Sequence, residues 1–280
     1  MVRMKVGLTL KTFAILCFIA GFLYIHCGSD VFLLVIVTSA PGNHAQRSAI
    51  RQTWGNESNV PGTAIKTVFA VGKPGNASTQ RGLERENTVQ KDIIQEDFVA
   101  SYENLTIKTV MCLKWASEFC FNAKFVLKAD DDTFVQIYNL VRHLRDLNST
   151  MTKRFVTGYV NNGARPLRTS NRGYGSRWVV SKEDYPRDTF PTYPSGFAYV
   201  ISNDITGQIY EVSLTLKYLF LEDAFLGLCL EQLKVDPVHD TRFYPWAASP
   251  SCTTNQDRVA FHWLKTHDAI IRAWHDANSC

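Results

Sequence analysis

The chain has 280 residues, of which 45% are hydrophobic and 20% are charged, and its formal net charge is +4. This length and composition suit one large globular domain, or two closely joined lobes, with ample core. A charge this small, without a basic tract or an arginine-rich helix, argues against nucleic acid as a partner. The sequence has no internal repeat and no low-complexity region.

The N-terminal segment differs in kind from the rest. Basic residues such as Arg3 and Lys5 precede an apolar run over residues 6–25, which Lys11 interrupts. This pattern predicts a cytoplasmic tail of residues 1–5, a signal-anchor transmembrane helix over 6–25 and a lumenal remainder. A cleaved signal peptide has a similar charge pattern and a shorter apolar core, and it stays the alternative. Residues 26–30 then form a very short stem before a domain over 31–280.

Cysteine and asparagine usage fits the lumenal side of a membrane. Six cysteines lie beyond the apolar run, and their pairing is left open by the sequence. None of them has the spacing of zinc ligands. Four N-x-S/T sequons, at Asn56, Asn76, Asn104 and Asn148, are predicted N-glycosylation sites.

Hydrophobic periodicity predicts strands that alternate with helices. Strands are expected over 31–37, 65–71, 125–129, 155–160 and 198–201, and helices over 83–95, 104–120, 137–147, 203–220, 226–234 and around 270–274. The first strand is apolar on both faces, which is typical of a central strand covered on both sides. In the helix over 104–120, an apolar stripe that includes Trp115 and Phe119 is interpreted as core. The alternation predicts an α/β fold.

The strand over 125–129 ends in three consecutive aspartates. Successive side chains of an extended segment point to opposite faces, so Asp130 and Asp132 share a face and Asp131 points away. Two carboxylates that converge at the end of a buried strand suit a divalent cation carrying phosphate. A solvated turn after the strand explains the same residues. Calcium binding of the EF-hand type fails, because Val135 stands where that loop requires glycine.

Two arginines follow the first strand. Arg47 and Arg51 are four residues apart, so they lie on one face of a helical turn. Such a pair can clamp a diphosphate. Taken alone, the segment favours the alternative of a surface helix with two solvated arginines.

The middle of the chain holds an irregular segment and several aromatic residues. Residues 161–175 are rich in Gly, Asn and Arg without a period, which is typical of a functional or mobile loop. Trp178 lies beyond it, and a turn is predicted over Tyr193–Gly196. Aromatic rings beside a glycine suit stacking on a sugar ring and ordinary packing equally well.

Acidic residues precede the helix expected over 226–234. Glu222 and Asp223 lie at its N-terminus, where acidic side chains also serve as caps. A helix N-terminus lowers the pKa of a carboxylate, so a role as a base requires burial that raises the pKa again. On spacing alone, the late His262 is a packed histidine rather than a metal ligand.

Taken in order and spacing, these motifs resemble the β-1,3-glycosyltransferase family, which includes β-1,3-galactosyltransferases and β-1,3-N-acetylglucosaminyltransferases. The similarity covers about residues 31–275 and is carried by the segments 47–54, 97–102, 104–106, 108–109, 128–132, 178–185, 193–196 and 222–223. The resemblance implies a GT-A fold with a mixed central sheet flanked by helices, a UDP-sugar donor and Mn²⁺ as cofactor. Ala224 stands where relatives usually have Val, a departure that affects local packing rather than the chemistry.

The resemblance also implies roles for single residues. Asp132 matches the direct metal ligand, Asp130 lies toward the ribose and the metal, and His262 completes the metal site. Asp223 matches the catalytic base. Contacts with the nucleotide sugar are implied for Arg47, Arg51, Lys128, Asp130 and Asp131, and contacts with the donor or acceptor sugar for Trp178, Tyr193, Gly196 and Glu222.

The implied reaction moves galactose from UDP-galactose to the 3-hydroxyl of an acceptor sugar on a glycoprotein or glycolipid, with inversion. A base takes the hydroxyl proton, and a metal acts as the Lewis acid for the leaving diphosphate. The implied setting is the Golgi membrane, with a single-pass type II anchor and a lumenal catalytic domain. UDP-N-acetylglucosamine as donor is the alternative. An inactive sugar-binding pseudoenzyme is disfavoured, because the candidate ligands and base are all present.

Overall fold

The computed structural model describes residues 27–28, 30–147, 152–169, 175–253 and 256–279. The strands are β1 Leu33–Thr38, β2 Ile65–Lys73, β3 Ile93–Val99, β4 Phe125–Asp130, β5 Phe134–Val135, β6 Val156–Asn161, β7 Tyr193–Ser202, β8 Val238–His239, β9 Phe243–Ala247 and β10 Ala260–His262. The helices are α2 His44–Gln52, α3 Ala77–Gln90, α4 Leu105–Phe119, α5 Ile137–Asp146, α6 Thr206–Ser213, α7 Glu222–Leu233 and α8 His267–Asn278, with short 3₁₀ turns η1 Tyr102–Asn104, η2 Ser176–Trp178 and η3 Asn203–Ile205.

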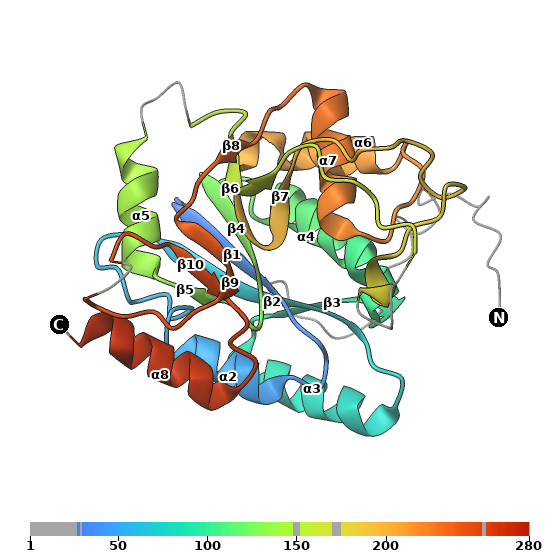
Figure 1. The fold of residues 1–280 in the computed structure, drawn as a ribbon. Coiled ribbons are helices and arrows are strands. Elements are labelled where there is room, and N and C mark those ends of the chain that lie inside the picture. The colour runs from blue at the N-terminus through green and yellow to red at the C-terminus, as the bar shows by residue number, and fades with distance from the viewer. Residues whose placement is uncertain (1–26, 29, 148–151, 170–174, 254–255, 280) are drawn as a thin grey trace.

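A seven-stranded mixed sheet forms the centre of the molecule, in the order β3-β2-β1-β4-β7-β6-β8 (Figure 1). Strands β3, β2, β1 and β4 run parallel, and β7 is antiparallel to both β4 and β6. The expected α/β fold with a mixed central sheet is therefore confirmed. Because β1 and β4 are parallel and Thr38 pairs with Asp130, the loop after β1 lies beside the aspartates that follow β4.

Helices cover both faces of this sheet. Figure 1 shows α2, α3 and α8 on one face and α4, α6 and α7 on the other. Strand β1 is buried along its whole length, as its apolar sequence predicts. Alternate residues enter different cores, since Val35 packs with Ile50 and Ile270, whereas Ile36 packs with Met111. This two-sided burial holds the carboxyl ends of β1 and β4 in place.

The small sheet brings the C-terminal segment to the end of β4. Its strand order is β5-β10-β9, and β10 pairs with β5 so that Phe261 lies opposite Phe134. This sheet was not predicted. Strands of two and three residues are too short to show a period of their own.

Two predicted helices have different limits. The helix expected over 83–95 is wrong at its end, because α3 stops at Gln90 and β3 begins at Ile93. Lys91 ends α3 in the left-handed conformation, at φ 54°. The helix expected over 203–220 ends at Ser213 as α6, after the short turn η3.

Two further predictions, one on a turn and one on the buried face of a helix, differ from the structure. The predicted turn over Tyr193–Gly196 is wrong, because these residues form the start of β7. The predicted core stripe of α4 is also incomplete. Trp115 and Phe119 stack on each other only half-buried, whereas Lys108 is buried.

Several predictions on the N-terminal segment and the sequons lie outside the described residues. These are the cytoplasmic tail over 1–5, the anchor over 6–25 and the sequon at Asn148. None of the helices that the structure does describe has the length and apolarity needed to cross a membrane. Just beyond the predicted anchor, Cys27 forms a disulfide with Cys120 at the end of α4, and Cys112 is a buried free thiol.

Candidate active site

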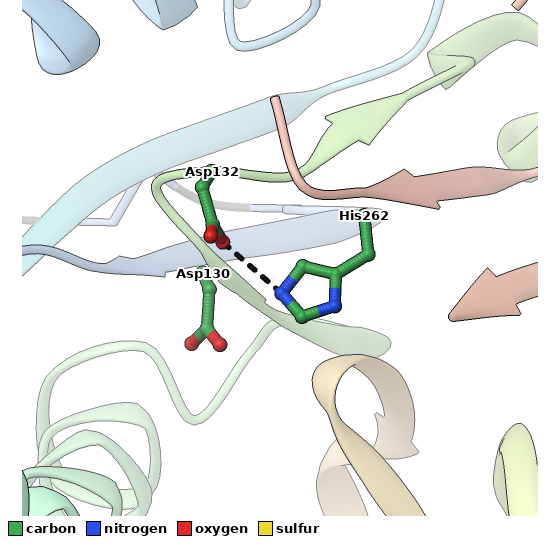
Figure 2. Close-up of side chains that lie close together, drawn as sticks. All are labelled: Asp130, Asp132 and His262. Carbon is green, nitrogen blue, oxygen red and sulfur yellow. Dashed lines mark ion pairs between the residues drawn. The ribbon is translucent and has the colours of Figure 1, made fainter. Parts of the chain in front are cut away.

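Two of the three consecutive aspartates meet a distant histidine. Asp130 ends β4, Asp132 follows in the turn before β5, and His262 ends β10. Their ligand atoms all lie within 4.8 Å of one another, and Nε2 of His262 is 3.3 Å from Oδ1 of Asp132 (Figure 2). Carboxylate oxygens with an imidazole nitrogen form a donor set that suits Mn²⁺ and similar divalent ions. These residues thus fit a metal ion, and the solvated-turn alternative leaves this convergence unexplained.

The backbone around His262 is tied directly to the aspartates. The backbone N–H of Leu264 donates to the carbonyl of Asp132 at 2.8 Å. Trp263, which lies between His262 and Leu264 in the chain, adopts φ 75°. This conformation is rare for a bulky residue and is found mostly where the surrounding structure enforces it. The imidazole of His262 also stacks on Phe197, with ring centroids 5.1 Å apart. The ring is therefore held from the backbone and from one face.

Asp130 is oriented through one of its two oxygens. Oδ1 accepts hydrogen bonds from Oγ1 of Thr38 at 2.6 Å and from Nζ of Lys128 at 2.7 Å. Both bonds go to the same oxygen. Oδ2 is therefore the oxygen of Asp130 that remains for a cation.

Asp131 points away from this group, as the strand alternation predicts. Its Oδ2 accepts hydrogen bonds from Oγ of Ser39 at 2.6 Å and Nδ2 of Asn43 at 2.9 Å, with the N–H of Ala40 at 3.3 Å. Burial raises the pKa of Asp131, and the bonds from Ser39 and Asn43 oppose that rise. Asp131 therefore fastens the loop after β1.

Arg47 and Arg51 lie on one face of α2, but this face is turned inward. Arg47 is fully buried and pairs with Glu86 of α3 at 2.7 Å, and it also donates to the carbonyl of Ala40 at 2.7 Å. Arg51 pairs with Glu86 at 2.8 Å and with Asp92 at 2.7 Å. The alternative of two solvated arginines is wrong. Both arginines form ion pairs within the protein, and Arg47 also supports the loop after β1 through the carbonyls of Ala40 and Pro41. Contact with a diphosphate stays a prediction.

The acidic pair forms the first turn of α7. Glu222 is buried and accepts hydrogen bonds from Oγ1 of Thr109 at 2.9 Å and Nζ of Lys128 at 3.1 Å. Burial raises the pKa of Glu222 to about 7, although the charge of Lys128 opposes the rise. Burial also raises the pKa of Asp223, against a bond of 2.8 Å from the N–H of Ala224 to its Oδ1. Desolvation therefore raises the pKa of these carboxylates by more than the helix N-terminus lowers it, and a role as base requires such a raised pKa.

Gly196 lies against both acidic side chains. Its N–H lies 3.4 Å from Oδ2 of Asp223. A Cβ at this position would lie 2.3 Å from Oε1 of Glu222. Only glycine lets β7 approach α7 this closely, and the approach links the acidic pair to the neighbouring Phe197.

Two tyrosines lie close enough to Asp223 to feel its charge. Burial and then the charge of Asp223 raise the pKa of Tyr193. Burial raises the pKa of Tyr102 to about 12, a hydrogen bond with Trp178 opposes this, and the charge of Asp223 adds to it. The guanidinium of Arg177 lies 5.6 Å from the ring of Tyr102 and 5.9 Å from that of Trp178. Trp178 is 38% exposed, so part of its ring is open to a ligand.

The structure thus gathers the predicted residues into two neighbouring groups. One is the metal group of Asp130, Asp132 and His262, and the other is the acidic pair with its aromatic surroundings. Sequence reasoning did not assign a site role to the residues that support these groups, which are Thr38, Ser39, Asn43, Tyr102, Lys108 and Thr109. The position of Thr38 and Ser39 beside the aspartates could have been predicted from the sequence. Polar residues at the end of a parallel strand lie at the same sheet edge as those at the end of the neighbouring strand.

A polar cavity of 780 Å³ lies elsewhere, between α5 and the segment after β8. Arg242 and Asp240 line it and pair with each other at 2.8 Å. None of the metal-group residues lines this cavity. The convergence of the metal-ligand atoms of Asp130, Asp132 and His262, rather than this cavity, therefore marks the candidate active site.

The galactosyltransferase family model matches residues 45–241, a span that holds both aspartates of the metal group and the acidic pair. The chain belongs to the galactosyltransferase family. Beta-1,3-galactosyltransferase 1 of Homo sapiens is 36% identical over 248 residues, which cover 89% of this chain and 74% of that protein. Beta-1,3-galactosyltransferase 5 of Pan paniscus is 40% identical over 237 residues, which cover 84% of this chain and 77% of that protein. The membership confirms the resemblance found in the sequence.

One solved structure aligns with most of this chain. The galactosyltransferase LgtC, solved with donor and acceptor sugar analogues, aligns with 88% of this chain and 95% of its own, at a TM-score of 0.42 and 13% identity. At that score, the structural likeness carries no weight for function.

Proposed function

We propose that this family member is an inverting β-1,3-galactosyltransferase of the GT-A type, which uses UDP-galactose and Mn²⁺. The observation that carries the proposal is the convergence of Asp130, Asp132 and His262 beside an acidic pair in which Glu222 is buried and Asp223 is partly buried. The names of the similar relatives support galactose as the sugar and a β-1,3 linkage as the product.

The residues divide the chemistry between the two groups. Asp130, Asp132 and His262 would hold the metal ion, which when bound supplies the positive charge that the leaving diphosphate needs. Asp223 takes the proton from the 3-hydroxyl of the acceptor, and the burial that raises its pKa makes it a stronger base. Trp178 and Tyr193 offer aromatic surface for the acceptor sugar beside that base.

A panel of donors tests this proposal. The full-length protein in detergent is assayed with UDP-galactose and UDP-N-acetylglucosamine, each with Mn²⁺ or with a chelator. We expect transfer from UDP-galactose that is lost on chelation. Preference for UDP-N-acetylglucosamine would move the protein to the alternative donor, and activity that survives chelation would remove the metal from the mechanism.

The base is tested by Asp223→Asn. We expect transfer to fall by at least about 10²-fold, because the amide cannot take the proton, whereas binding of UDP stays within a factor of about three. Isothermal titration with UDP and Mn²⁺ measures the binding. If turnover persists in this variant and is lost in Glu222→Gln, the base is Glu222.

We also propose a type II Golgi membrane protein anchored by residues 6–25. The Cys27–Cys120 disulfide suits an oxidising lumenal compartment, and Asn56 and Asn76 are exposed sequons. Glycosidase treatment should shift the mobility of the protein expressed in cells, and Asn56→Gln should remove one part of that shift. A soluble form has to begin before Cys27, because a later start would leave Cys120 unpaired. An unglycosylated protein that proteases reach from the cytosol would overturn this topology.

A further inference from the structure

Lys128 lies between the metal group and the acidic pair. Its side chain leaves β4, and the residue is 5% exposed. Nζ donates to Oδ1 of Asp130 at 2.7 Å, to Oε1 of Glu222 at 3.1 Å and to the carbonyl of Gly196. An ammonium group has three N–H donors, and these three acceptors use all of them. No donor of Lys128 is left for a nucleotide sugar.

The three acceptors belong to three different elements. Asp130 ends β4 and belongs to the metal group. Gly196 is in β7, directly before the Phe197 ring on which His262 stacks. Glu222 begins α7 and adjoins Asp223. One buried cation therefore holds both groups of the site to a common point.

We propose that Lys128 is a positioning residue that sets the distance and orientation between the metal group and the base on α7, and that it does not bind the nucleotide sugar. This inference rests on the transferase function proposed above. The reacting atoms must meet the base in a productive geometry, and a misplacement of about 1 Å can reduce the rate by about 10²-fold.

Charge gives the reason for a cation at this point. The carboxylates of the buried Glu222 and the partly exposed Asp130 both bind the same ammonium group, and without that cation they would repel each other. Removing one member of a buried ion pair leaves the other uncompensated, so α7 would move away from β4 or Glu222 would take up a proton. Either response changes the position of Asp223. In addition, Lys128 and Thr38 both bind Oδ1 of Asp130, and together they leave Oδ2 free.

Lys128→Met tests the proposal, because methionine keeps most of the volume and removes the charge. In the full-length protein we expect kcat for transfer from UDP-galactose to fall by about 10²-fold. The KM for the donor and the Kd for UDP with Mn²⁺, measured by titration calorimetry, should change by less than about threefold. Lys124→Met is the matched control, because Lys124 is exposed just before the start of β4, and it should leave kcat and KM unchanged.

A second variant separates positioning from folding. Lys128→Met/Glu222→Gln removes both charges of the pair, so stability lost in Lys128→Met should return, while kcat stays well below that of Glu222→Gln alone because nothing sets the position of α7. A rise in Kd for UDP with an unchanged kcat would overturn the proposal in favour of nucleotide binding. Recovery of kcat together with stability would show that Lys128 is needed only for folding. If the wild-type protein transfers no sugar, the proposed function fails, and the titration with UDP and Mn²⁺ still decides whether Lys128 binds the nucleotide.

Discussion

Gly196 shows how closely single residues are matched at this site. The glycine has no side chain, and its backbone approaches two carboxylates while its carbonyl accepts a bond from Lys128. Glu222, held by Lys128 and Thr109, cannot swing aside to make room for a methyl group. A change of one carbon atom at Gly196 is therefore expected to disturb both the fold and the chemistry.

We predict that Gly196→Ala lowers the free energy of unfolding by about 1–3 kcal/mol and reduces transfer, because the new Cβ would lie 2.3 Å from Oε1 of Glu222. Gly82→Ala is the matched control. It lies in α3 with no atom within 4 Å of the added carbon, and it should raise stability by up to about 1 kcal/mol. Denaturant unfolding and the transfer assay measure both. Equal effects of the two substitutions would contradict the packing described here.

The raised pKa of Glu222 predicts a pH-dependent stability. Its pKa in the folded protein is about 7, above the ordinary value of about 4.3. Between about pH 4.3 and 7, the folded state therefore keeps a proton on Glu222 that the unfolded state has released. The stabilisation is complete below about pH 4.3 and is lost as the pH rises through 7. Glu222→Gln cannot lose this proton. We therefore expect the unfolding free energy of the wild type to fall relative to the variant between about pH 5 and 8, and parallel curves would contradict the prediction.

At the scale of elements, the loop after β1 is fixed by charged side chains from three directions. Arg47 of α2 donates to the carbonyls of Ala40 and Pro41, Lys108 of α4 donates to that of Ser39, and Asp131 accepts from the loop. The same Arg47 pairs with α3 through Glu86. The loop is thus shaped before any ligand binds, at the edge of the sheet where the aspartates lie.

We predict different results for the two arginines of α2. Arg47→Met should lower the free energy of unfolding by about 3–5 kcal/mol, because the buried Glu86 loses its bidentate partner and keeps only Arg51, and the carbonyls of Ala40 and Pro41 lose their donor. Arg51→Met should cost less, because Arg51 retains some exposure and Asp92 can turn to water. If neither arginine contacts the diphosphate, the KM for the donor in Arg51→Met stays near that of the wild type. A large rise in this KM would support the diphosphate clamp instead.

At the scale of the whole molecule, the Cys27–Cys120 disulfide closes most of the N-terminal half of the domain into one loop. The two cysteines are 93 residues apart in sequence. A link across so long a loop restricts the unfolded chain strongly. It also fastens the chain beside the predicted anchor to the end of α4.

We predict that the Cys27→Ser/Cys120→Ser variant loses about 2–4 kcal/mol of unfolding free energy. The transfer activity of the folded variant should persist, because neither cysteine belongs to the metal group or to the acidic pair. Denaturant unfolding compares the variant with the wild type, and peptide mapping without reductant identifies the link. A variant as stable as the wild type would show that the disulfide does not constrain the unfolded chain.

The sequence by itself determined the features that depend on neighbouring residues. Alternation along one strand was enough to separate Asp131 from Asp130 and Asp132, and an apolar run was enough to place β1 in the centre of the sheet. Only the tertiary structure brought His262 to the aspartates, through strands too short to carry a periodic signal. It also decided that Arg47 points inward and that Lys128 has no free donor. Those outcomes depend on long-range pairing and on which charges are buried together, and no local pattern of residues contains that information.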